Sequence, residues 1–364
     1  MLKPIYAIPD LPPQVNLETV PVLKALARAN RALAELKGRA ATIPNQGILI
    51  DTLSLQEAKA SSEIENIVTT QDELFQADLH LEGVDSPAAK EVALYRDAVK
   101  LGYDHLRQSG GLITNRTLIE MFRLLKRRDG GFRVTPGTAL KNDSTGEVVY
   151  VPPQDAREIE AAMVALERFV NQDELSALDP LIKMALIHHQ FESIHPFPDG
   201  NGRIGRILNV LYLTRAGLLE IPILYLSRHI TRTKADYYRL LQMVRTQGAW
   251  EEWVLYMLGA VAETAQTTLA LVEGMRVQMA AAKKRMRDEV PNLYSQDLLN
   301  NLFRHPYTRI EFVVKDLGVS RQTAAKYLDL LAEKGFVAKH RSGRSNYYVN
   351  EALVRLFLDV SGGR

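Results

Sequence analysis

The sequence predicts an all-α-dominated fold with one small β-hairpin near its middle and a separate module at its C-terminus. Apolar residues recur at helical spacing through most of the chain before Pro291. Residues 133–153 interrupt that pattern with two short β-prone runs on either side of a turn signal at residues 142–146. After Pro291 the order changes to helix, turn, helix and β-hairpin. We therefore expect three regions, residues 1–110, 111–275 and 292–364.

The elements before the hairpin follow from local signals. Residues 1–20 hold four prolines and no clear period, so we expect an extended arm. Gly38 stands at a plausible C-cap position after the first helix, and Ser86-Pro87 form a good N-cap and N1 pair for a later one. The helices expected here span residues 20–37, 53–67, 86–109 and 115–127.

The elements after the hairpin are again helical. Asp179-Pro180 opens a helix whose apolar positions mostly suit one buried face, and Gly217 ends another. A polar stretch that ends at Val290-Pro291 is expected to be a linker. One helix expected here ends at about residue 171. The others span residues 180–193, 201–216, 231–246 and 249–272.

Composition excludes several classes of protein. Hydrophobic residues make up 46% of the 364 residues, charged residues make up 24%, and the formal net charge is +2. The chain has no cysteine, which excludes disulfides, Cys-ligated zinc and a thiol nucleophile. The N-terminus lacks the apolar core of a signal peptide, and no run of about 18 apolar residues predicts a membrane helix. We expect a cytoplasmic protein that does not contact a membrane.

One stretch, HPFPDGNGRIGR at residues 195–206, combines groups that suit a nucleotide phosphate. The DGNG turn leads into a helix whose N-terminal N–H groups can bind an anion. Arg203 and Arg206 lie three residues apart and could reach the same phosphate. Asp199 carries the oxygen ligand that Mg²⁺ prefers, and His195 is a natural general base near neutral pH. A Gly-rich turn with solvated arginines is the structural alternative, which the combination of all these groups disfavours.

This stretch resembles, at every defining position, the HPFx[D/E]GNGRxxR signature of Fic-domain proteins. The hairpin ending in VVYVPP and the segments that begin at Leu224 and Trp250 are similar to the flap and the later helices of that family. The resemblance implies a Fic-type helical core and AMPylation, the transfer of AMP from ATP to a protein Ser, Thr or Tyr hydroxyl with release of pyrophosphate. It also implies Mg²⁺ as the metal and a target segment docked at residues 149–153.

The resemblance further implies a role for each residue of the motif. His195 would deprotonate the target hydroxyl, and Asp199 would hold Mg²⁺ against the α- and β-phosphates. Arg203 would contact the phosphates, and Arg206 would contact the γ-phosphate. The remaining nucleotide-binding positions would be Gly200, Asn201 and Gly202, whose backbone forms an anion hole, then Ile204 and Gly205, and finally Tyr237 and Tyr238. The two tyrosines resemble a pair that lines the adenosine side, and helix packing is their alternative role.

A second motif lies well upstream of the first. Ser61, Glu65 and Asn66 in SSEIENI resemble the inhibitory motif [S/T]xxxE[G/N] of the same family. The resemblance implies that Glu65 enters the nucleotide site, pairs with Arg206 and leaves ATP in a non-productive pose. A solvated helix face is the alternative. The same glutamate could instead position a water for removal of AMP, so both directions stay open.

The C-terminal module, residues 292–364, is basic. Within residues 301–350 nine Lys and Arg oppose four Asp and Glu, a net charge of +5. The segment VVKDLGVSRQTAAKYLDLLAEKGFV resembles a winged helix-turn-helix, in which Ser320 would cap the second helix. Arg321, Gln322 and Lys326 would then face outward, which suits contact with DNA through residues 292–355. A protein-docking or dimerisation module is the alternative, and a homodimer is an expectation from the family alone.

Two competing functions remain. The first is a DNA-binding regulator whose Fic part only senses a nucleotide. The second is a metallohydrolase that uses His188, His189, His195 and Asp199. Adjacent residues on a helix point about 100° apart, so His188 and His189 could not easily share a metal.

Overall fold

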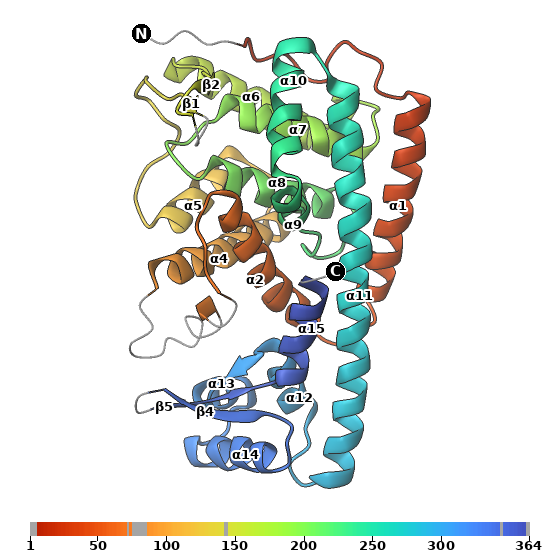
Figure 1. Ribbon diagram of the computed structural model, residues 1–364, viewed down its shortest axis with the longest axis vertical. Coiled ribbons are helices and arrows are strands. Elements are labelled where there is room, and N and C mark those ends of the chain that lie inside the picture. Colours follow the sequence, from red (N-terminus) through yellow and green to blue (C-terminus); the bar gives the residue numbers. More distant parts are fainter. Residues whose placement is uncertain (1–5, 71–72, 75–85, 142–144, 343–344, 362–364) are drawn as a thin grey trace.

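The computed structural model describes residues 6–70, 73–74, 86–141, 145–342 and 345–361. The molecule is elongated, and α11 (Trp250–Glu289) runs along its long axis (Figure 1). This helix connects a large helical core to the C-terminal module, and α1 (Val20–Ala40) packs along its first half. The prediction of a mainly helical fold with one small hairpin in the core is confirmed.

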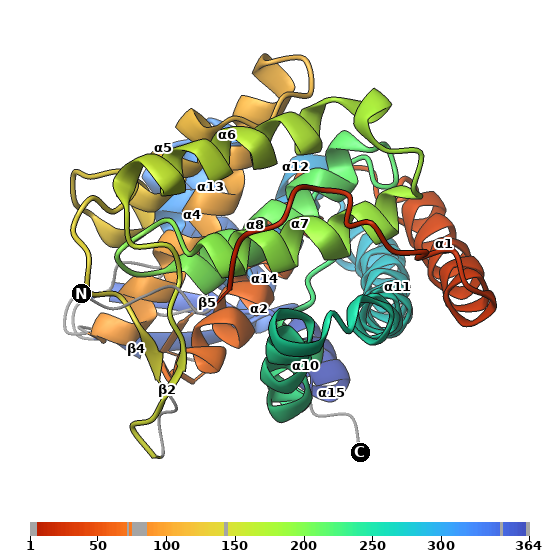
Figure 2. The ribbon, with the colours of Figure 1, turned by 90° about the horizontal axis from the view of Figure 1, so that it is seen from above.

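The helix α7 (Pro180–Ile194) forms the centre of the core together with α8 (Asn201–Arg215). All α7 residues after Pro180 are buried, so this helix presents no face to solvent. In Figure 2, α5 (Asn115–Lys126) and α6 (Ala156–Asn171) lie on one side of this pair, and α10 (Lys234–Gln247) and α11 lie on the other. A helix enclosed on all sides gives a rigid base to the loop that follows it.

Three further helices complete the core. They are α2 (Gly47–Ile64), α4 (Pro87–Gln108) and α9 (Ser227–Arg232). The helix α2 packs between α4 and α9, and α4 also packs against α8. The local signals for α4 act as expected, since Ser86 caps the helix through Ala89 N–H and Pro87 is its first residue.

The predicted hairpin is present and short. It pairs β1 (Leu140–Lys141) with β2 (Val148–Tyr150) in antiparallel fashion, with Leu140 opposite Tyr150. The Tyr150 side chain is buried, and its hydroxyl donates to Ser193 O at 2.7 Å. Part of the turn, residues 142–144, lies outside the described residues. The hairpin is thus attached to the C-terminal end of α7, next to the candidate site.

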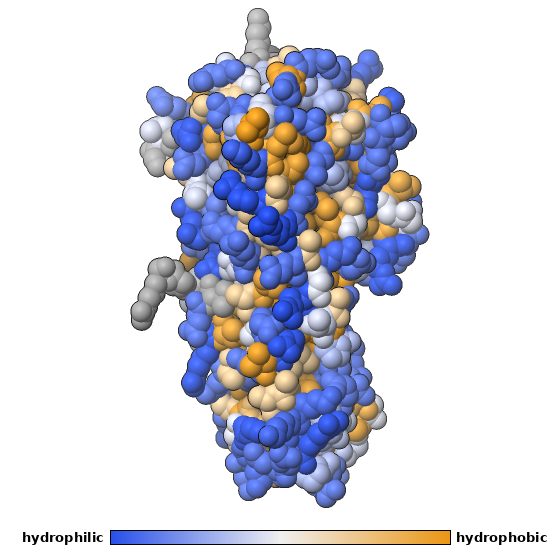
Figure 3. Space-filling view, turned by 90° about the vertical axis from the view of Figure 1, so that its right-hand side faces the viewer, coloured by the Kyte–Doolittle hydropathy of each residue, from blue (hydrophilic) through white to orange (hydrophobic). Residues whose placement is uncertain are grey.

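The C-terminal module has a three-stranded antiparallel sheet in the order β3-β5-β4. Its elements are α12 (Gln296–Arg304), β3 (Tyr307–Thr308), α13 (Ile310–Leu317), α14 (Arg321–Glu333), β4 (Ala338–Ser342), β5 (Ser345–Val349) and α15 (Glu351–Ser361). Ser320 caps α14 through Thr323 N–H, as expected. On the side of the molecule that carries α1 and α11, hydrophilic residues cover the end formed by this module (Figure 3).

Two predicted helix bounds at the N-terminal end were wrong. Gly38 lies inside α1, which continues to Ala40, because Ala40 extends the buried stripe of this helix. The helix α2 begins at Gly47, six residues before the predicted start, and ends at Ile64. It ends there because Asn66 takes a positive φ of 62°, which a helix cannot continue.

Two further predictions were wrong around α11. Residues 231–246 do not form one helix, because α9 ends at Arg232 and α10 begins at Lys234. The stretch predicted as a linker before Val290 is helical, since α11 continues to Glu289 with Met275, Met279 and Met286 buried. Within the described chain, α11 is also long and apolar enough to cross a membrane by length and composition alone. Its apolar residues pack instead against α1, α7, α10 and α15.

Candidate active site

The backbone of His195 ends α7 with a sharp turn. Its φ of 50° and ψ of 58° lie in the left-handed region, which is uncommon for residues other than glycine. Its N–H closes the helix by donating to Phe191 O at 2.9 Å. Because Pro196 follows, the helix cannot continue. The turn therefore projects the imidazole from the rigid end of α7.

A buried arginine that the sequence analysis did not assign, Arg133, holds this turn in place. Its backbone N–H donates to Pro196 O at 2.7 Å, and its Nε donates to His195 O at 2.8 Å. Its Nη2 donates to Ile194 O at 3.3 Å and also to Pro153 O, just after the hairpin. Arg133 thus ties the hairpin to the backbone on both sides of His195. Its position at the start of the hairpin segment is the only sequence signal it offers.

The imidazole of His195 is neutral in this environment. Burial and the nearby Arg133 and Arg245 charges lower the pKa of His195 to about 3. Arg245 is fixed by a hydrogen bond from its Nε to Ser193 Oγ at 3.0 Å, and its guanidinium lies 3.8 Å from the centre of the Tyr150 ring. A neutral imidazole can accept a proton, which is the first requirement of a general base.

The loop between α7 and α8 is closed by its own side chains. Asn201 Oδ1 accepts a hydrogen bond from Phe197 N at 2.8 Å, and Asn201 Nδ2 donates to Phe197 O at 2.7 Å. The Phe197 ring is buried and stacks on Phe122 of α5 at a centroid distance of 4.6 Å. Gly200, which precedes α8, has a φ of 76° that favours glycine. The Asn201 side chain is therefore structural, and its backbone lies at a helix N-terminus that suits an anion.

Three other residues of the predicted nucleotide-binding stretch have packing roles. A Cβ atom on Gly202 would lie 2.8 Å from Arg206 Nη1 and 2.9 Å from Glu65 Oε1. A Cβ atom on Gly205 would lie 2.7 Å from Glu192 Oε1. The two glycines thus let charged side chains approach α8 closely. Ile204 is fully buried, so its side chain has no surface for a ligand in this conformation.

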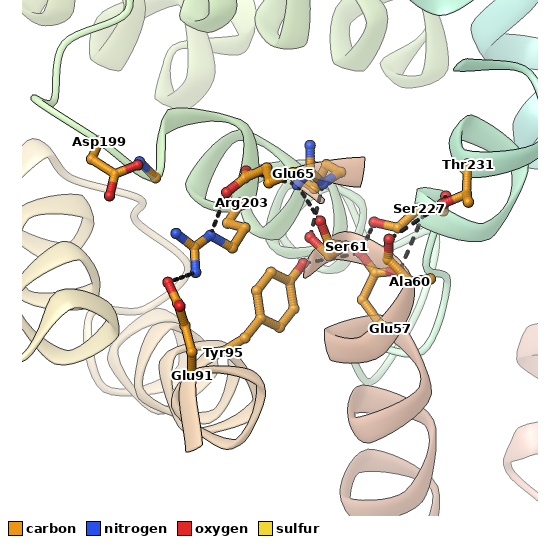
Figure 4. A network of polar contacts seen from close by, with 12 residues as sticks. Glu57, Ala60, Ser61, Glu65, Glu91, Tyr95, Asp199, Arg203, Ser227 and Thr231 are labelled. Atoms are coloured by element: carbon orange, nitrogen blue, oxygen red, sulfur yellow. Dashed lines mark hydrogen bonds and ion pairs between the residues drawn. The ribbon is translucent and has the colours of Figure 1, made fainter. Parts of the chain in front are cut away.

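Both arginines of α8 are buried and paired with Glu65. Arg203 Nε lies 2.8 Å from Glu65 Oε2 (Figure 4). Arg206 Nη2 lies 3.1 Å from Glu65 Oε1. The arginine side chains are only 1% and 2% exposed. The pair with Arg206 was expected from the upstream motif, whereas the pair with Arg203 was not. A single carboxylate therefore bridges the two guanidinium groups.

The other two residues of the upstream motif support this bridge. Arg206 Nε donates to Ser61 Oγ at 2.8 Å, and Arg206 Nη2 donates to Ser61 O at 2.9 Å. Glu65 is the C-cap of α2, and Asn66 follows it with a positive φ. A positive φ favours asparagine or glycine, which gives a physical reason for such a residue after Glu65.

Asp199, the candidate Mg²⁺ ligand, is exposed in the loop. Lys126 Nζ lies 2.5 Å from its Oδ2, and Gly200 N donates to its Oδ1 at 2.6 Å. Partial burial raises the pKa of Asp199, but the hydrogen bond and charge of Lys126 lower it further, so the carboxylate stays ionised. The described residues contain no group of three or more His, Cys, Asp or Glu arranged for a metal. Any metal here would need additional oxygen ligands from a substrate.

A second carboxylate that the sequence analysis missed, Glu91 of α4, extends this network. Its Oε1 lies 2.6 Å from Arg203 Nη1 and 3.2 Å from Lys126 Nζ. Lys126 therefore connects the Asp199 side of the loop to the arginine side. Nothing in the local sequence distinguishes Lys126 or Glu91, because both act across different helices.

The helix α2, which carries Glu65, is anchored deep in the core by Glu57. Tyr95 of α4 donates to Glu57 Oε1 at 2.9 Å, and the Ser227 hydroxyl of α9 donates to the same oxygen (Figure 4). Burial raises the pKa of Glu57 to about 7. At the other end of α2, Asp51 Oδ2 lies 3.3 Å from Arg304 Nε of α12. The C-terminal module thus contacts the helix that occupies the site.

One proposed nucleotide-binding tyrosine and the two histidines of the alternative metal hypothesis lie in the core. Tyr237 is buried, and its hydroxyl lies 2.9 Å from His188 Nε2, so it packs in the core and has no surface for an adenosine in this conformation. Tyr238 is exposed beside it. His188 and His189 are also core residues, and His189 Nε2 lies 3.3 Å from Leu241 O. Neither is placed to share a metal with Asp199, which removes the basis of the metallohydrolase hypothesis.

This geometry suits a polyphosphate. A neutral imidazole at the end of α7, the N-terminus of α8 and the two guanidinium groups of α8 are joined by one short loop, which also carries an exposed carboxylate. The model of the Fic/DOC family matches residues 112–213, which include this whole loop. This chain is a Fic-domain protein. Residues 23–104 match the Fic/DOC family N-terminal model, and residues 278–353 match the model described as protein adenylyltransferase SoFic-like, C-terminal domain.

Curated relatives match part of this Fic protein. A protein adenylyltransferase Fic of Drosophila erecta is 28% identical over 127 residues, which are 35% of this chain and 24% of the relative. A protein of the same name from Nematostella vectensis is 36% identical over 92 residues, which are 25% of this chain and 20% of the relative. The matches thus span at most about a quarter of the length of these two relatives.

Solved structures support the fold over a longer span. A Fic family protein of Desulfovibrio desulfuricans aligns with a TM-score of 0.55 at 21% identity, covering 96% of this chain and 98% of that one. Fic-1 of C. elegans aligns with a TM-score of 0.53 at 20% identity, covering 70% of this chain and 74% of that one. At these identities the likeness concerns the fold alone.

Proposed function

We propose that this Fic protein transfers AMP from ATP to a Ser, Thr or Tyr hydroxyl of a target protein, and to itself. The observation that carries the proposal is the placement of the neutral His195 imidazole at the end of α7, one short loop away from the anion-binding start of α8 and the two arginines. The names of the curated relatives support the same reaction.

In the proposed reaction His195 accepts the proton of the target hydroxyl. The hydroxyl oxygen attacks the α-phosphorus of ATP, a new P–O bond forms to AMP, and the bond to pyrophosphate breaks. The N–H groups at the start of α8 and the side chains of Arg203 and Arg206 would hold the phosphate oxygens. The negative charge of the bound nucleotide would raise the pKa of His195 from its low value, which strengthens it as a base.

The residues present fit one Mg²⁺ ion. Asp199 offers an ionised carboxylate beside the phosphate site, which is the kind of ligand Mg²⁺ takes together with phosphate oxygens. The metal would neutralise charge on the phosphates. Lys126 now pairs with the Asp199 carboxylate, so its ammonium group would have to move away or share Asp199 Oδ2 with the metal.

We further propose that Glu65 inhibits the reaction. It pairs with both arginines, so a triphosphate that needs Arg206 must first displace a carboxylate from a buried site. The cost of separating such a pair is large, because each charge loses its partner in a low-dielectric environment. The alternative is that Glu65 takes part in the removal of AMP from a target. In that case a Glu65 variant should lose the AMP-removal reaction.

The flap hairpin is proposed to dock the target segment. Val148 and Val149 in β2 are exposed although they belong to a strand, which suits pairing with an added strand. Tyr150 and Arg133 fix the end of the same hairpin to the backbone around His195. A target segment added there would bring its hydroxyl to a defined distance from the imidazole.

The test compares three proteins incubated with Mg²⁺ and α-labelled ATP. We expect AMP addition, measured by intact mass, to be slow in the wild type, at least tenfold faster in Glu65→Gly, and lost in Glu65→Gly/His195→Ala. The double variant keeps the relieved site and removes only the base. AMP addition that persists without His195 would refute the reaction, and equal rates with and without Glu65 would refute the inhibition.

For the C-terminal module we propose a winged-helix arrangement that contacts duplex DNA. The order of its helices and its small sheet support that arrangement. Gln322 and Lys326 are exposed on α14, and Lys339 and His340 are exposed on β4. Arg344, which the winged-helix resemblance would place on the wing with Lys339 and His340, lies outside the described residues. Protein docking is the alternative, and the contact between α12 and α2 supports an effect of either partner on Glu65.

A further inference from the structure

A cavity of about 320 Å³ lies where the Fic core meets the C-terminal module. It is lined by residues of α2, α9, α11 and α15, which lie close together in the middle of the molecule (Figure 1). None of the residues that line it belongs to the 195–206 loop. Its volume falls at the lower end of the range for small-molecule sites, which is about 300–1,000 Å³.

Apolar side chains form much of the wall of this cavity. They are Leu53 of α2, Ile223 and Tyr225 before α9, Leu271 of α11 and Leu358 of α15. Leu358 is exposed although it is a large apolar residue, so the cavity is open to solvent on the side of α15. Such a surface suits the apolar body of a ligand.

Three polar groups in the same wall have no hydrogen-bond partner among the described residues. Thr264 and Thr268 lie one helical turn apart on α11 and line the cavity, and among the described residues their hydroxyls make no hydrogen bond but are not buried unpaired atoms. Gln56 Nε2 of α2 is buried and also has no acceptor. Buried polar groups are normally paired, so the buried Gln56 Nε2 indicates a missing partner. A ligand with acceptor oxygens would supply it.

The charges around the cavity favour an anionic head group. Glu263 already has two partners. Its Oε2 lies 2.9 Å from His229 Nδ1, and its Oε1 lies 2.5 Å from Arg232 Nη1. Lys59 is half-buried and has no acidic partner among the described residues. Burial and Arg232 lower the pKa of Arg228, which shows that these cations crowd one another.

Two further carboxylates line the cavity, and neither neutralises Lys59. Glu57 is engaged by Tyr95 and Ser227, and burial raises its pKa to about 7. Glu63 is exposed and does not reach Lys59 within ion-pair distance, although it lies one turn away. The cation at the cavity wall is therefore left for a ligand.

We propose that this cavity binds a small amphipathic carboxylate. Its apolar chain would lie against Leu53, Leu271 and Leu358, and its carboxylate would accept hydrogen bonds from Lys59 and Gln56. The size of the cavity limits the ligand to a small free molecule.

The consequence for activity rests on the proposed inhibitory role of Glu65. One wall of the cavity is α2 itself, in the position that places Glu65 on the two arginines. A ligand that binds only this arrangement must stabilise it. Occupation of the cavity would therefore strengthen inhibition, and displacement of α2 would expel the ligand.

The test uses octanoate as the probe and the full chain as the protein. Calorimetry should show binding of octanoate to the wild type and at least fivefold weaker binding of the uncharged octanamide. Lys59→Gln removes the cation, and Thr268→Leu fills the cavity, so each should weaken octanoate binding at least tenfold. Thr246→Leu makes the same change on an exposed position of α10 and should leave binding within twofold of the wild type.

Three results would overturn the proposal. They are no octanoate binding at millimolar concentration, equal binding of octanamide, and binding that Lys59→Gln leaves unchanged. AMP addition is measured separately, and octanoate should slow it in the wild type but not in Glu65→Gly. If octanoate binds as expected and no protein adds AMP, the site stands and the proposed function fails. If AMP addition behaves as proposed and octanoate does not bind, only the site fails.

Discussion

The 195–206 loop and the C-terminal module are both basic, yet they use their charges in different ways. Arg203 and Arg206 are 1% and 2% exposed, and their acidic partners come from α2 and α4. Arg321 of α14 is 70% exposed, and its partner, Glu311, belongs to the same module. Burial makes the first set of pairs costly to separate, whereas exposed pairs contribute about 0–1 kcal/mol. The same residue type therefore belongs to a buried ion-pair network in one region and to a solvated surface in the other.

Removal of Glu65 should have the largest effect on stability. Glu65→Gln leaves two buried guanidinium groups without their shared carboxylate, so we expect the free energy of unfolding to fall by about 3 kcal/mol. ATP with Mg²⁺ should raise the melting temperature of this variant more than that of the wild type, because the phosphates replace the lost charge. Thermal unfolding with and without nucleotide measures both effects.

The matched control is Glu63→Gln on the same helix, an exposed residue without an ion pair among the described residues. This change should alter the free energy of unfolding by no more than about 0.5 kcal/mol. Equal stability of the Glu65 and Glu63 variants would show that the buried ion pairs of Glu65 contribute no more to the free energy of unfolding than an exposed glutamate does.

An Arg133 variant tests whether the 195–206 loop needs an arginine that binds no phosphate. Arg133→Lys keeps the charge but cannot reach three carbonyl groups with one ammonium, so the turn at His195 should loosen. In a Glu65→Gly background we expect kcat for AMP addition to fall about 100-fold, with ATP affinity unchanged within about twofold. Arg128→Lys, an exposed change, should leave kcat unaltered. A fall in ATP affinity alone would place Arg133 in nucleotide binding instead.

Charge removal in the C-terminal module should leave stability nearly unchanged. Arg321→Gln and Lys326→Gln should each change the free energy of unfolding by less than about 0.5 kcal/mol, because both side chains are exposed. If the module binds duplex DNA as proposed, each change should reduce the slope of log affinity against log salt by about 1. Fluorescence anisotropy with a labelled duplex between 50 and 200 mM salt measures this slope. Binding that salt does not weaken would support protein docking.

A final prediction concerns pH and the anchor of α2. Burial raises the pKa of Glu57 from 4.5 to about 7, so the folded state holds a proton that the unfolded state releases above pH 4.5. The stability that Glu57 contributes is therefore full below pH 4.5 and is lost as pH rises through 7. Relative to Glu57→Gln, the wild type should lose melting temperature between pH 5 and pH 8. A constant difference between the two proteins over that range would contradict the shift.

Most of the helical fold could be predicted, and the misses have clear causes. Capping signals such as Ser86-Pro87 and Ser320 act locally, so the helices they begin start where the sequence indicates. Gly38 and the stretch before Val290 misled the prediction because buried residues further along continued each helix. Tertiary packing there outweighed local propensity.

The sequence by itself determined the chemistry of the site. The spacing of His195, Asp199, Arg203 and Arg206, and the upstream Glu65, is visible in the printed chain because each motif is continuous. Only the tertiary structure decided that Glu65 bridges two arginines, that Arg133 clamps the histidine turn, and that Lys126 joins Asp199 to Glu91. These contacts join residues from 35 to 141 positions apart. Such pairs depend on how whole helices pack, and no local pattern encodes that packing.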